Sequence, residues 1–424
     1  MFLINKPLFL LICWLLPALL TAQDFLKEAD DYLYPFQKVE SKNLANFIKE
    51  IAADKRIIGL GEVSHFTKDC YDLKSAIIHT LIEEGYDGLV LEVDFGQALI
   101  WNDYLVSGEG NLDSIVAQSG WFTYRTEEFK SLLANIRAYN KTSEQAFQVF
   151  GMEMTAVNHN ISWLQAYFKN ILPENHSIFE RLAQERNIVA FGSFNATEQS
   201  DYWTLFTELN TILMDHQDQL KAEKGAAKYA IAQRITEIMR QFATYIAQDD
   251  YGLKGEFRDQ FSARNVYWCM QQLGADSKIA IWAHNGHVAK TSILFNYDVL
   301  GHYLEQWFGE AYYAIGFNWN KGAFGAFSNE GFKRWEFEEV SEPSLSRDFA
   351  ALNANYVLLD VRRFLAKEPA PDHFFRQAIP ARSDMSESYN ESRSRMMEIN
   401  LSKTFDAYIY IHDAKYPSVI SWLP

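Results

Sequence analysis

The chain has 424 residues, of which 48% are hydrophobic and 15% aromatic, so it is long and apolar enough to build a large packed core. Its formal net charge of −16 at pH 7 argues against nucleic acids and anionic lipids as partners, because so acidic a surface repels phosphate groups. This charge does not exclude neutral or cationic small molecules.

The first 22 residues have the features of an export signal. Lys6 is the single charged residue before the apolar run Pro7–Leu20, and Ala22 offers a small residue before a cleavage point at Gln23. The run is shorter than a typical membrane span, and nothing comparable follows it. We therefore expect residues 1–22 to be removed and the mature chain to be periplasmic or extracellular, with no stable membrane span.

Once residues 1–22 are removed, Cys70 and Cys269 are the cysteines that remain. An oxidising compartment would allow them to pair, but two cysteines do not make the disulfide framework of a small secreted domain. Two buried thiols explain them equally well.

Short apolar segments alternate with longer helical patterns along the rest of the chain. Most are apolar throughout, as expected for strands buried on both faces of a parallel sheet. We predict seven strands: Ile57–Gly61, Leu89–Val93, Phe147–Met152, Ile279–Ala283, Tyr312–Phe317, Tyr356–Leu359 and Ala407–Ile411. Between the first two, Leu73, Ile77 and Leu81 follow helical spacing and Gly85 can end the helix, which makes a βαβ unit.

The pattern changes between about residues 161 and 250. This stretch is helix-forming for most of its length and holds no good strand. We interpret it as helices inserted between two strands of one sheet, where such an insertion often caps a site. The predicted fold is α/β, with a mainly parallel central sheet, helices on both faces and an inserted helical cap. No linker rich in Pro, Gly or Ser divides it, so we expect one domain over residues 23–424.

Acidic and imidazole side chains follow four of these strands, where each strand ends. In chain order they are Glu62 and His65, Glu92 and Asp94, Glu153, and finally His284 and His287 with Asn285 between them. Ligands of open α/β sheets bind beyond the carboxyl ends of the strands. A carboxylate at a buried strand end is costly to desolvate unless it is paired, so four such ends indicate a functional site.

Each of these residues also has a structural explanation. Glu62 could cap the helix that follows it, and Glu92 could pair with a core arginine. His284 and His287 could be hydrogen-bonded core histidines. Lys74, one turn into the first helix, would ordinarily be a solvated lysine. The convergence of four strand ends favours a site over these separate explanations.

Several known catalytic motifs are absent from the sequence. It has no G-x-S-x-G elbow of a serine hydrolase, no H-E-x-x-H zinc motif, no C-x-x-C pair and no P-loop. We expect no cofactor, although a divalent metal is not excluded, because two or three histidines with carboxylates can hold zinc or manganese.

Six blocks follow one another from about residue 50 to the C-terminus: "GLGEVSHFTKDCYDLKSAIIHTLIEEGYDGLVLEVDFGQA", "FGMEM", "FRDQFSARNVYWC", "KIAIWAHNGHVAK", "GHYLEQWFGEAYYAIGF" and "YVLLDVRRF". Each block is weakly specific alone, but the ordered set resembles the erythromycin esterase family. The resemblance implies that water hydrolyses a macrolide lactone, or a related carboxylic ester, without a covalent serine intermediate.

The resemblance also implies roles for individual positions. Glu62 and His65 match the family's glutamate and catalytic histidine. Glu92 matches its second glutamate and His284 its second histidine, with His287 in the same motif.

The sequence departs from the family pattern at two positions. Lys74 stands where the family commonly has arginine, so a planar bidentate donor is replaced by a point charge. Phe66 stands where the family commonly has glycine, and its large ring is expected to alter the pocket beside the presumed base. We expect the hydrolytic machinery to be retained, with the macrolide specificity as the open question.

These assignments give a hypothesis for the mechanism. His65, neutral near pH 7, removes a proton from a water held over an ester carbonyl. Glu62 or Glu92 orients the imidazole and stabilises its charged form.

Donors to the developing oxyanion come from the same cluster, namely His284, His287 or Lys74. The neighbours Arg258 and Asp259 are expected to form an ion pair beneath the site, with a plain structural role equally open. The substrate-binding or supporting residues are predicted to be Phe66, Asp94, Glu153, Arg258 and Asn285.

Two other classes of function stay open at this point. A metal-dependent hydrolase would use the same His/Glu cluster as ligands. The second open class is a non-catalytic protein that binds iron or haem, since related α/β folds include surface proteins of this kind. The presence of the presumed base and both glutamates favours the hydrolase, with a small-molecule ester or lactone as its partner.

Overall fold

The computed structural model describes residues 29–172, 175–184, 194–293, 296–328, 331–339, 344–367, 376–382 and 396–421. The predicted export signal, residues 1–22, lies outside them. Within the described ranges, no helix combines the length and the apolar character that crossing a membrane requires.

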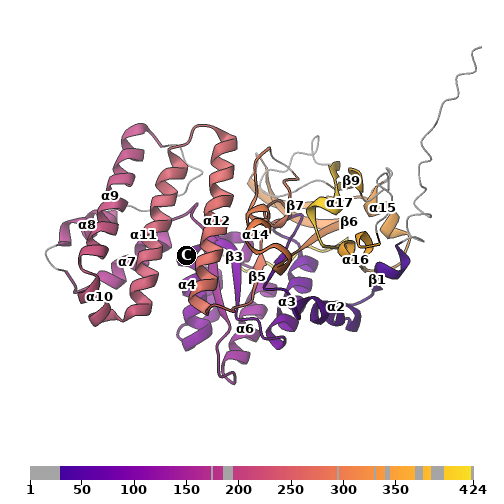
Figure 1. The fold of residues 1–424 in the computed structure, drawn as a ribbon, viewed down its shortest axis with the longest axis horizontal. Helices are drawn as coiled ribbons and strands as arrows, with labels where there is room; N and C mark the ends of the chain where they lie inside the picture. Colours follow the sequence, from indigo (N-terminus) through magenta and orange to yellow (C-terminus); the bar gives the residue numbers. More distant parts are fainter. Residues whose placement is uncertain are drawn as a thin grey trace, which may run out of the picture.

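A nine-stranded mixed sheet forms the centre of the described structure, in the order β1-β8-β11-β6-β2-β5-β3-β4, with β7 paired to β6 (Figure 1). The six neighbours from β11 to β4 run parallel, and β1, β7 and β8 pair antiparallel. The strands are β1 Leu33–Phe36, β2 Ile57–Leu60, β3 Gly88–Asp94, β4 Gln148–Glu153, β5 Ile279–Trp282, β6 Tyr312–Ser328, β7 Gly331–Phe337, β8 Tyr356–Leu359 and β11 Ala407–Ala414. A separate two-stranded sheet consists of β9 Ile379–Arg382 and β10 Met396–Ile399.

All seven predicted strands are present, and the predicted α/β fold with a mainly parallel sheet is confirmed. β6 continues well beyond its predicted end at Phe317, because it pairs with β11 and then with β7. The sequence did not indicate β1, β7, β9 or β10. β1 is an edge strand interrupted by Pro35, and β7 has no fully buried residue, so neither has the apolar run of a buried strand.

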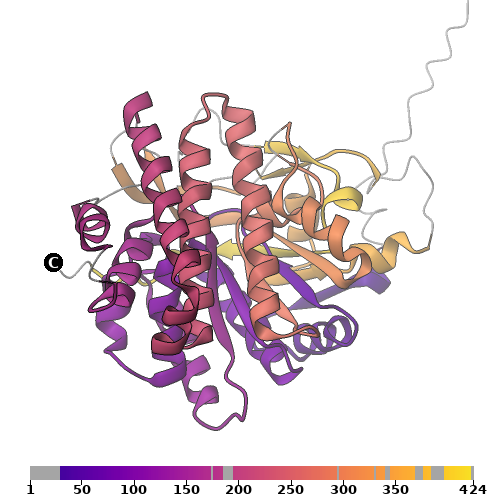
Figure 2. The ribbon, with the colours of Figure 1, turned by 60° about the vertical axis from the view of Figure 1, so that its left-hand side comes forward.

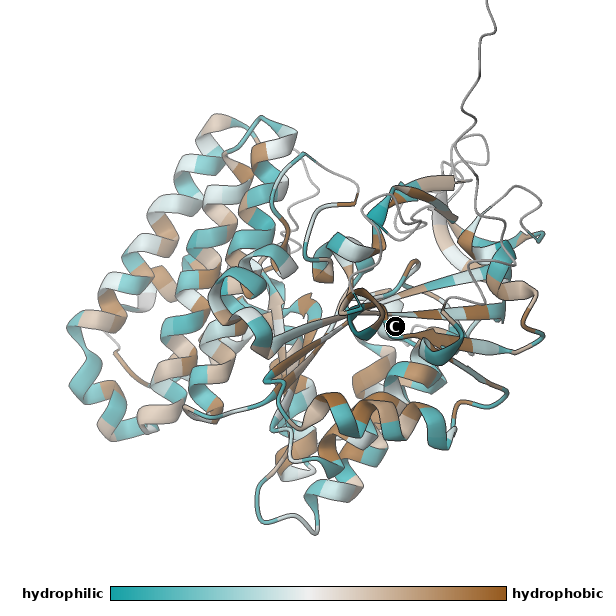
Figure 3. Cartoon of the chain, turned by 45° about the vertical axis from the view of Figure 1, so that its right-hand side comes forward, coloured by the Kyte–Doolittle hydropathy of each residue, from teal (hydrophilic) through white to brown (hydrophobic). Residues whose placement is uncertain are grey.

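Helices cover both faces of the sheet and bury an apolar core against each. One core joins the sheet to α2, α3 and α6, and the other joins it to the helices between β4 and β5 and to α14. In Figure 3 the central strands are largely brown, whereas the helices carry teal on their outer sides. The helices outside the insertion are α2 Lys42–Ala52, α3 Lys68–Glu83, α4 Phe95–Ser107, α5 Leu112–Ala117, α6 Glu127–Asn140, α13 Asn285–Val288, α14 Leu300–Phe308, α15 Leu345–Ala350, α16 Val361–Leu365 and α17 Leu401–Thr404. Short 3-10 turns are η1 Asp30–Tyr32, η2 Phe122–Tyr124 and η4 Gly309–Ala311.

The helical insertion lies between β4 and β5, as predicted. It consists of α7 Asn158–Phe168, α8 His176–Gln184, α9 Ala196–Asp215, α10 Gln217–Lys224, α11 Ala226–Ile246 and α12 Tyr251–Leu273. The long helices α9, α11 and α12 stand side by side (Figures 1 and 2). The insertion therefore extends beyond the predicted end at about residue 250 by the whole of α12, which lies against β4 and connects the insertion to the sheet.

Candidate active site

Four adjacent parallel strands, β2, β5, β3 and β4, end at one edge of the sheet, and each supplies a polar side chain there. Glu62 follows β2, and His284 lies just beyond β5. Glu92 and Glu153 lie at or near the ends of β3 and β4. All four residues are at most 5% exposed. The structure therefore places these buried polar groups at the edge where the sequence predicted a site.

Glu62 is the centre of the first half of the cluster. Its Oε1 lies 2.7 Å from His65 Nδ1, and its Oε2 accepts hydrogen bonds from Lys74 Nζ at 2.6 Å and Trp282 Nε1 at 3.0 Å. Lys74 is fully buried and its Nζ lies 4.6 Å from the centre of the Trp282 ring. Both carboxylate oxygens are thus occupied, and one of them orients His65.

Glu62 and Lys74 stabilise each other's charge inside the protein. Burial by itself raises the pKa of Glu62, but the attraction of Lys74 and the hydrogen bond with His65 outweigh it and hold that pKa below its ordinary value. Burial lowers the pKa of Lys74, against the attraction of Glu62. Glu62 is therefore a carboxylate at neutral pH, as a residue that supports an imidazolium must be.

Glu92 is the centre of the second half. Its Oε1 lies 2.8 Å from Arg258 Nη2 and 3.1 Å from His287 Nε2, and its Oε2 accepts the backbone N–H of His284 at 2.8 Å. Burial alone would raise the pKa of Glu92, but His287, His65 and Arg258 together hold it well below its usual range. This carboxylate is ionised and has partners on both oxygens.

His287 lies between two carboxylates. Its Nδ1 is 2.5 Å from Asp259 Oδ1, and its Nε2 faces Glu92. Burial alone lowers the pKa of His287, but Asp259 and Glu92 outweigh it and raise the pKa well above its ordinary value. His287 is therefore an imidazolium at neutral pH, with both ring nitrogens donating, so it cannot serve as the general base.

Arg258 joins the ends of two strands. Its guanidinium forms a bidentate pair with Glu153, with Nε 3.0 and 3.1 Å from the two carboxylate oxygens, and also reaches Glu92. The predicted ion pair between Arg258 and Asp259 is wrong: Arg258 pairs with the two glutamates, and Asp259 pairs with His287. Consecutive residues of a helix point in different directions, which separates these two side chains.

His284 faces His65 across the site, with ring centres 5.1 Å apart. It is the N-cap of α13, where its Nδ1 accepts the backbone N–H of Gly286 at 3.1 Å. A neutral His284 with Nδ1 as acceptor carries its proton on Nε2. It is thus oriented as a donor through Nε2.

Two predicted supporting residues have contacts that fix the fold. Asp94 is the N-cap of α4 and its carboxylate lies 3.0 Å from His159 Nδ1 and 3.1 Å from Asn160 Nδ2. Asn285 bonds both the N–H and the C=O of Phe317, which fastens α13 to β6. These contacts give both residues a structural reason to be polar.

The side chains of Lys74 and Phe66 are both buried against other protein groups. The sequence predicts Lys74 as one of three candidate donors to the oxyanion, but its Nζ is buried against Glu62 and Trp282, which makes it a support for Glu62. Phe66 is buried and packs on other aromatic rings. Its ring therefore lies beside the site without entering the His65–Glu62 contact.

Sequence reasoning missed two residues that position the site. Trp282, the last residue of β5, donates to Glu62, and it lies two residues before His284, a spacing that puts both on one side of an extended chain. The Tyr71 hydroxyl donates to the backbone C=O of His65 at 2.7 Å and also contacts that of Thr123. Tyr71 lies one helical turn before Lys74, so the two side chains share one face of α3, and this spacing is the sequence signal that could have identified Tyr71.

The donor set does not fit a metal centre. Within the described residues, no group of three or more His, Cys, Asp and Glu side chains is arranged to hold a metal ion. Both nitrogens of His287 face carboxylates, and Lys74 and Arg258 bring positive charge to the glutamates that would be ligands. The geometry supports charge-paired general acid–base chemistry.

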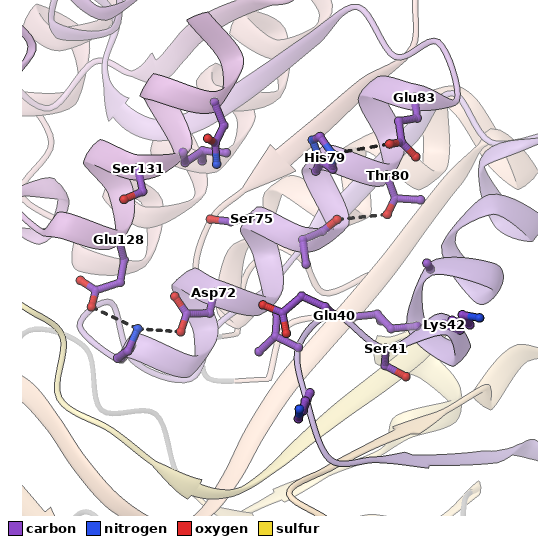
Figure 4. Close-up of a pocket in the computed structure, with 18 of the residues that line it drawn as sticks. Glu40, Ser41, Lys42, Asp72, Ser75, His79, Thr80, Glu83, Glu128 and Ser131 are labelled. Atoms are coloured by element: carbon purple, nitrogen blue, oxygen red, sulfur yellow. Dashed lines mark hydrogen bonds and ion pairs between the residues drawn. The ribbon is translucent and has the colours of Figure 1, made fainter. Parts of the chain in front are cut away.

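A groove of about 880 Å³ lies on the outer side of α3, between α2 and α6 (Figure 4). Lys68 bridges Asp72 at 2.7 Å and Glu128 at 3.4 Å along it, and His79 lies 3.5 Å from Glu83. Lys74 faces the opposite, inner side of the helix. The groove is therefore separate from the cluster.

A family model described as erythromycin esterase matches residues 82–414. The match starts after Glu62, His65 and Lys74 and includes the remainder of the cluster. The erythromycin esterase type II of Escherichia coli is 22% identical over 413 residues, which cover 88% of this chain and 93% of the relative.

Solved structures share the fold over nearly the whole chain. A protein from Bacillus cereus superposes with a TM-score of 0.81 at 23% identity, covering 94% of this chain and 99% of its own. A mutant erythromycin esterase in its open conformation gives a TM-score of 0.68 at 19% identity, covering 92% and 99%. At these identities the likeness concerns the fold alone.

Proposed function

Because the chain belongs to the erythromycin esterase family, we propose that it is a hydrolase that adds water to a carboxylic ester or lactone without a covalent serine intermediate. The observation that carries this proposal is the contact between His65 and Glu62. It joins a histidine whose side chain is 19% exposed to a carboxylate that is 4% exposed. This arrangement presents an oriented imidazole to a ligand while its supporting charge stays buried.

His65 acts as the general base. With Nδ1 donating to Glu62, the imidazole accepts the proton of an attacking water on Nε2. Of the three site histidines, His287 is held as an imidazolium, and His284 uses Nδ1 as an acceptor at the helix end. His65 is the one whose arrangement suits proton uptake from water.

The charges of the cluster favour that proton uptake. The pKa values of Glu62 and Glu92 are both held below the ordinary value, and His65 is one of the groups that interact with each of them. An imidazolium formed at His65 therefore faces two ionised carboxylates, which stabilise the state in which the base has accepted its proton.

His284 donates to the oxyanion. Its ring lies 5.1 Å from that of His65, and its neutral form carries the proton on Nε2. A carbonyl held between the two rings can receive water on the His65 side and a hydrogen bond on the His284 side. The tetrahedral charge is thereby stabilised where it develops. When the intermediate collapses, the bond to the alcohol oxygen breaks and the His65 imidazolium returns its proton to that oxygen, which releases acid and alcohol.

The test is water addition to a panel of substrates. The chain from residue 23 onward, stripped of metal, is incubated with macrolides, simple lactones and alkyl esters, and the products are followed by mass spectrometry with and without added zinc. The proposal expects at least one macrolide or lactone to gain one water, or at least one alkyl ester to split into its acid and its alcohol, at a rate that zinc does not change. Hydrolysis that requires zinc, or no hydrolysis of any of them, contradicts it.

We also propose that the protein is exported, so that its substrate is met in the periplasm or outside the cell. Support comes from the charge and apolar pattern of residues 1–22. Fractionation of cells that express the full chain, compared with a chain that starts at residue 23, checks this. Export of both chains or of neither contradicts the proposal.

A further inference from the structure

Four aromatic rings from four segments of the chain form a cluster beside the catalytic histidine. Phe66 follows His65, Phe122 lies in η2, Phe332 lies in β7, and Tyr416 follows β11. The centre of the Phe66 ring is 5.1 Å from Phe332, 5.4 Å from Tyr416 and 6.2 Å from Phe122. Phe122 and Phe332 are themselves 4.7 Å apart. We call these four residues the aromatic patch.

The patch has a buried base and a partly open surface. Phe66 is 1% exposed, whereas Phe122, Phe332 and Tyr416 are half-buried, so each of these three presents part of its ring to solvent. The edge-to-face packing of Phe332 and Tyr416 on Phe66 is a favourable aromatic geometry. This packing fixes the outer rings on a common support.

Hydrogen bonds tie two of the outer segments to the loop that carries His65. The Tyr71 hydroxyl contacts the backbone C=O of both His65 and Thr123, the residue after Phe122. The residue before Tyr416 is held twice, because Lys415 N donates to Asp69 and its C=O accepts from Lys68 N. These segments therefore keep a fixed position relative to the base.

The third outer ring is tied in through β6. The N–H of Gly325 donates to the C=O of Phe66 at 3.1 Å, and β6 pairs with the strand that carries Phe332. A Cβ at Gly325 would lie 2.6 Å from Phe66 Cδ1 and 2.5 Å from Phe332 Cζ. Glycine at this position lets both rings pack against the strand, so the patch is built into the sheet.

We propose that the aromatic patch is the specificity surface of the esterase and binds an aryl group on the acyl or alcohol side of the ester. The proposal rests on the function proposed above. The patch adjoins the loop that carries the base, because Phe66 is the residue after His65 and the Tyr71 hydroxyl contacts the backbone C=O of both His65 and Thr123. Because the rings of the patch are already held in place by their packing on Phe66, they favour a planar aromatic group, which stacks on them, over a saturated ring of similar size.

Matched ester pairs test this directly. Ethyl phenylacetate is compared with ethyl cyclohexylacetate, and phenethyl acetate with 2-cyclohexylethyl acetate, so that one ring in each pair is aromatic and its match is saturated. We expect kcat/KM to favour the aromatic member of at least one pair by about tenfold, the factor that one good aromatic contact supplies.

Phe122→Ala and Phe332→Ala should each remove most of this preference, and Phe122→Leu, which keeps the apolar volume, should reduce it too. Trp203→Ala, at a 44% exposed aromatic on α9, is the control and should keep it. Equal kcat/KM within both pairs, or a preference that survives both alanine substitutions, overturns the inference while hydrolysis stands. Failure of the unmodified protein to hydrolyse any of the four esters or the earlier panel contradicts the proposed function, and the inference with it.

Discussion

His65, His284 and His287 are the same residue type in one site, yet their neighbours make them chemically different. His287 lies between two carboxylates and keeps its proton. His284 accepts the backbone N–H of Gly286 on Nδ1, so the neutral form of its ring carries the proton on Nε2. The Nδ1 of His65 lies 2.7 Å from Glu62 Oε1, and its side chain is more exposed than that of His287. The hydrogen-bond partner of each ring therefore decides its role.

Asp259→Asn tests the charge on His287. Burial alone lowers the pKa of His287, but Asp259 and Glu92 outweigh it, so the pKa in the folded protein lies above the unfolded value of 6.5. A raised pKa stabilises the fold fully below the unfolded value, and this stabilisation is lost as pH rises through the folded value. We expect the substitution to lower the free energy of unfolding by about 3 kcal/mol near pH 6, because it leaves a buried charge with one partner fewer.

Urea unfolding of both proteins near pH 6 and again near pH 10 measures the effect. The difference between the two proteins should be smaller at the higher pH, because the stabilisation by the His287 charge is lost as pH rises through its folded pKa. A difference that stays equal or grows with pH would show that His287 is not held as an imidazolium.

At the scale of the elements, α12 shows why the predicted insertion ended too early. Its first turns contain Gly252 and Gly255, and glycine is unfavourable inside a helix. Gly255 has a tertiary reason that the sequence does not display, because a Cβ there would overlap the ring of Tyr297. Asp250 caps the helix through the N–H of Leu253 at 2.9 Å, so α12 forms despite the two glycines.

Gly255→Ala should therefore disturb α12 where it carries Arg258 and Asp259. We expect a loss of about 1 to 3 kcal/mol in unfolding free energy from overpacking, together with a fall in esterase kcat/KM. Gly252→Ala is the matched control: its Cβ would meet a single atom within 4 Å, Asp250 Oδ1, and at the longer distance of 3.2 Å. Thermal unfolding and turnover of both variants measure the contrast, and equal behaviour of the two would remove the role given to Tyr297.

At the scale of the whole molecule, the sequence predicted the sheet and the edge where the site lies. Runs such as Ile57–Gly61 are apolar on both faces, and polar residues directly after such runs indicate the carboxyl edge. The partners across the site were not predictable, because Arg258 reaches Glu92 and Glu153 from a helix more than a hundred residues further along the chain. The burial of Lys74 was hidden for a similar reason, since its partner Glu62 and the covering Trp282 come from other elements.

The aromatic patch depends on the whole molecule in the same way. Its rings come from four separate segments, and Phe332 lies on β7, a strand that the sequence pattern did not indicate. Phe66 itself, a large ring next to His65, was visible in the sequence. Its ring partners Phe122, Phe332 and Tyr416 could not be predicted, because they lie on η2, on β7 and after β11, and the tertiary fold alone brings these segments together.

The central claim is that His65 removes the proton from the attacking water, and His65→Ala tests it most directly. With the ester that the unmodified protein hydrolyses best, we expect kcat/KM to fall by about 10³-fold, within the range of general-base catalysis. His79→Ala is the control, because that side chain is 67% exposed on the outer face of α3, and it should keep the full rate. A His65→Ala protein that is folded and retains the rate of the unmodified enzyme would contradict the account.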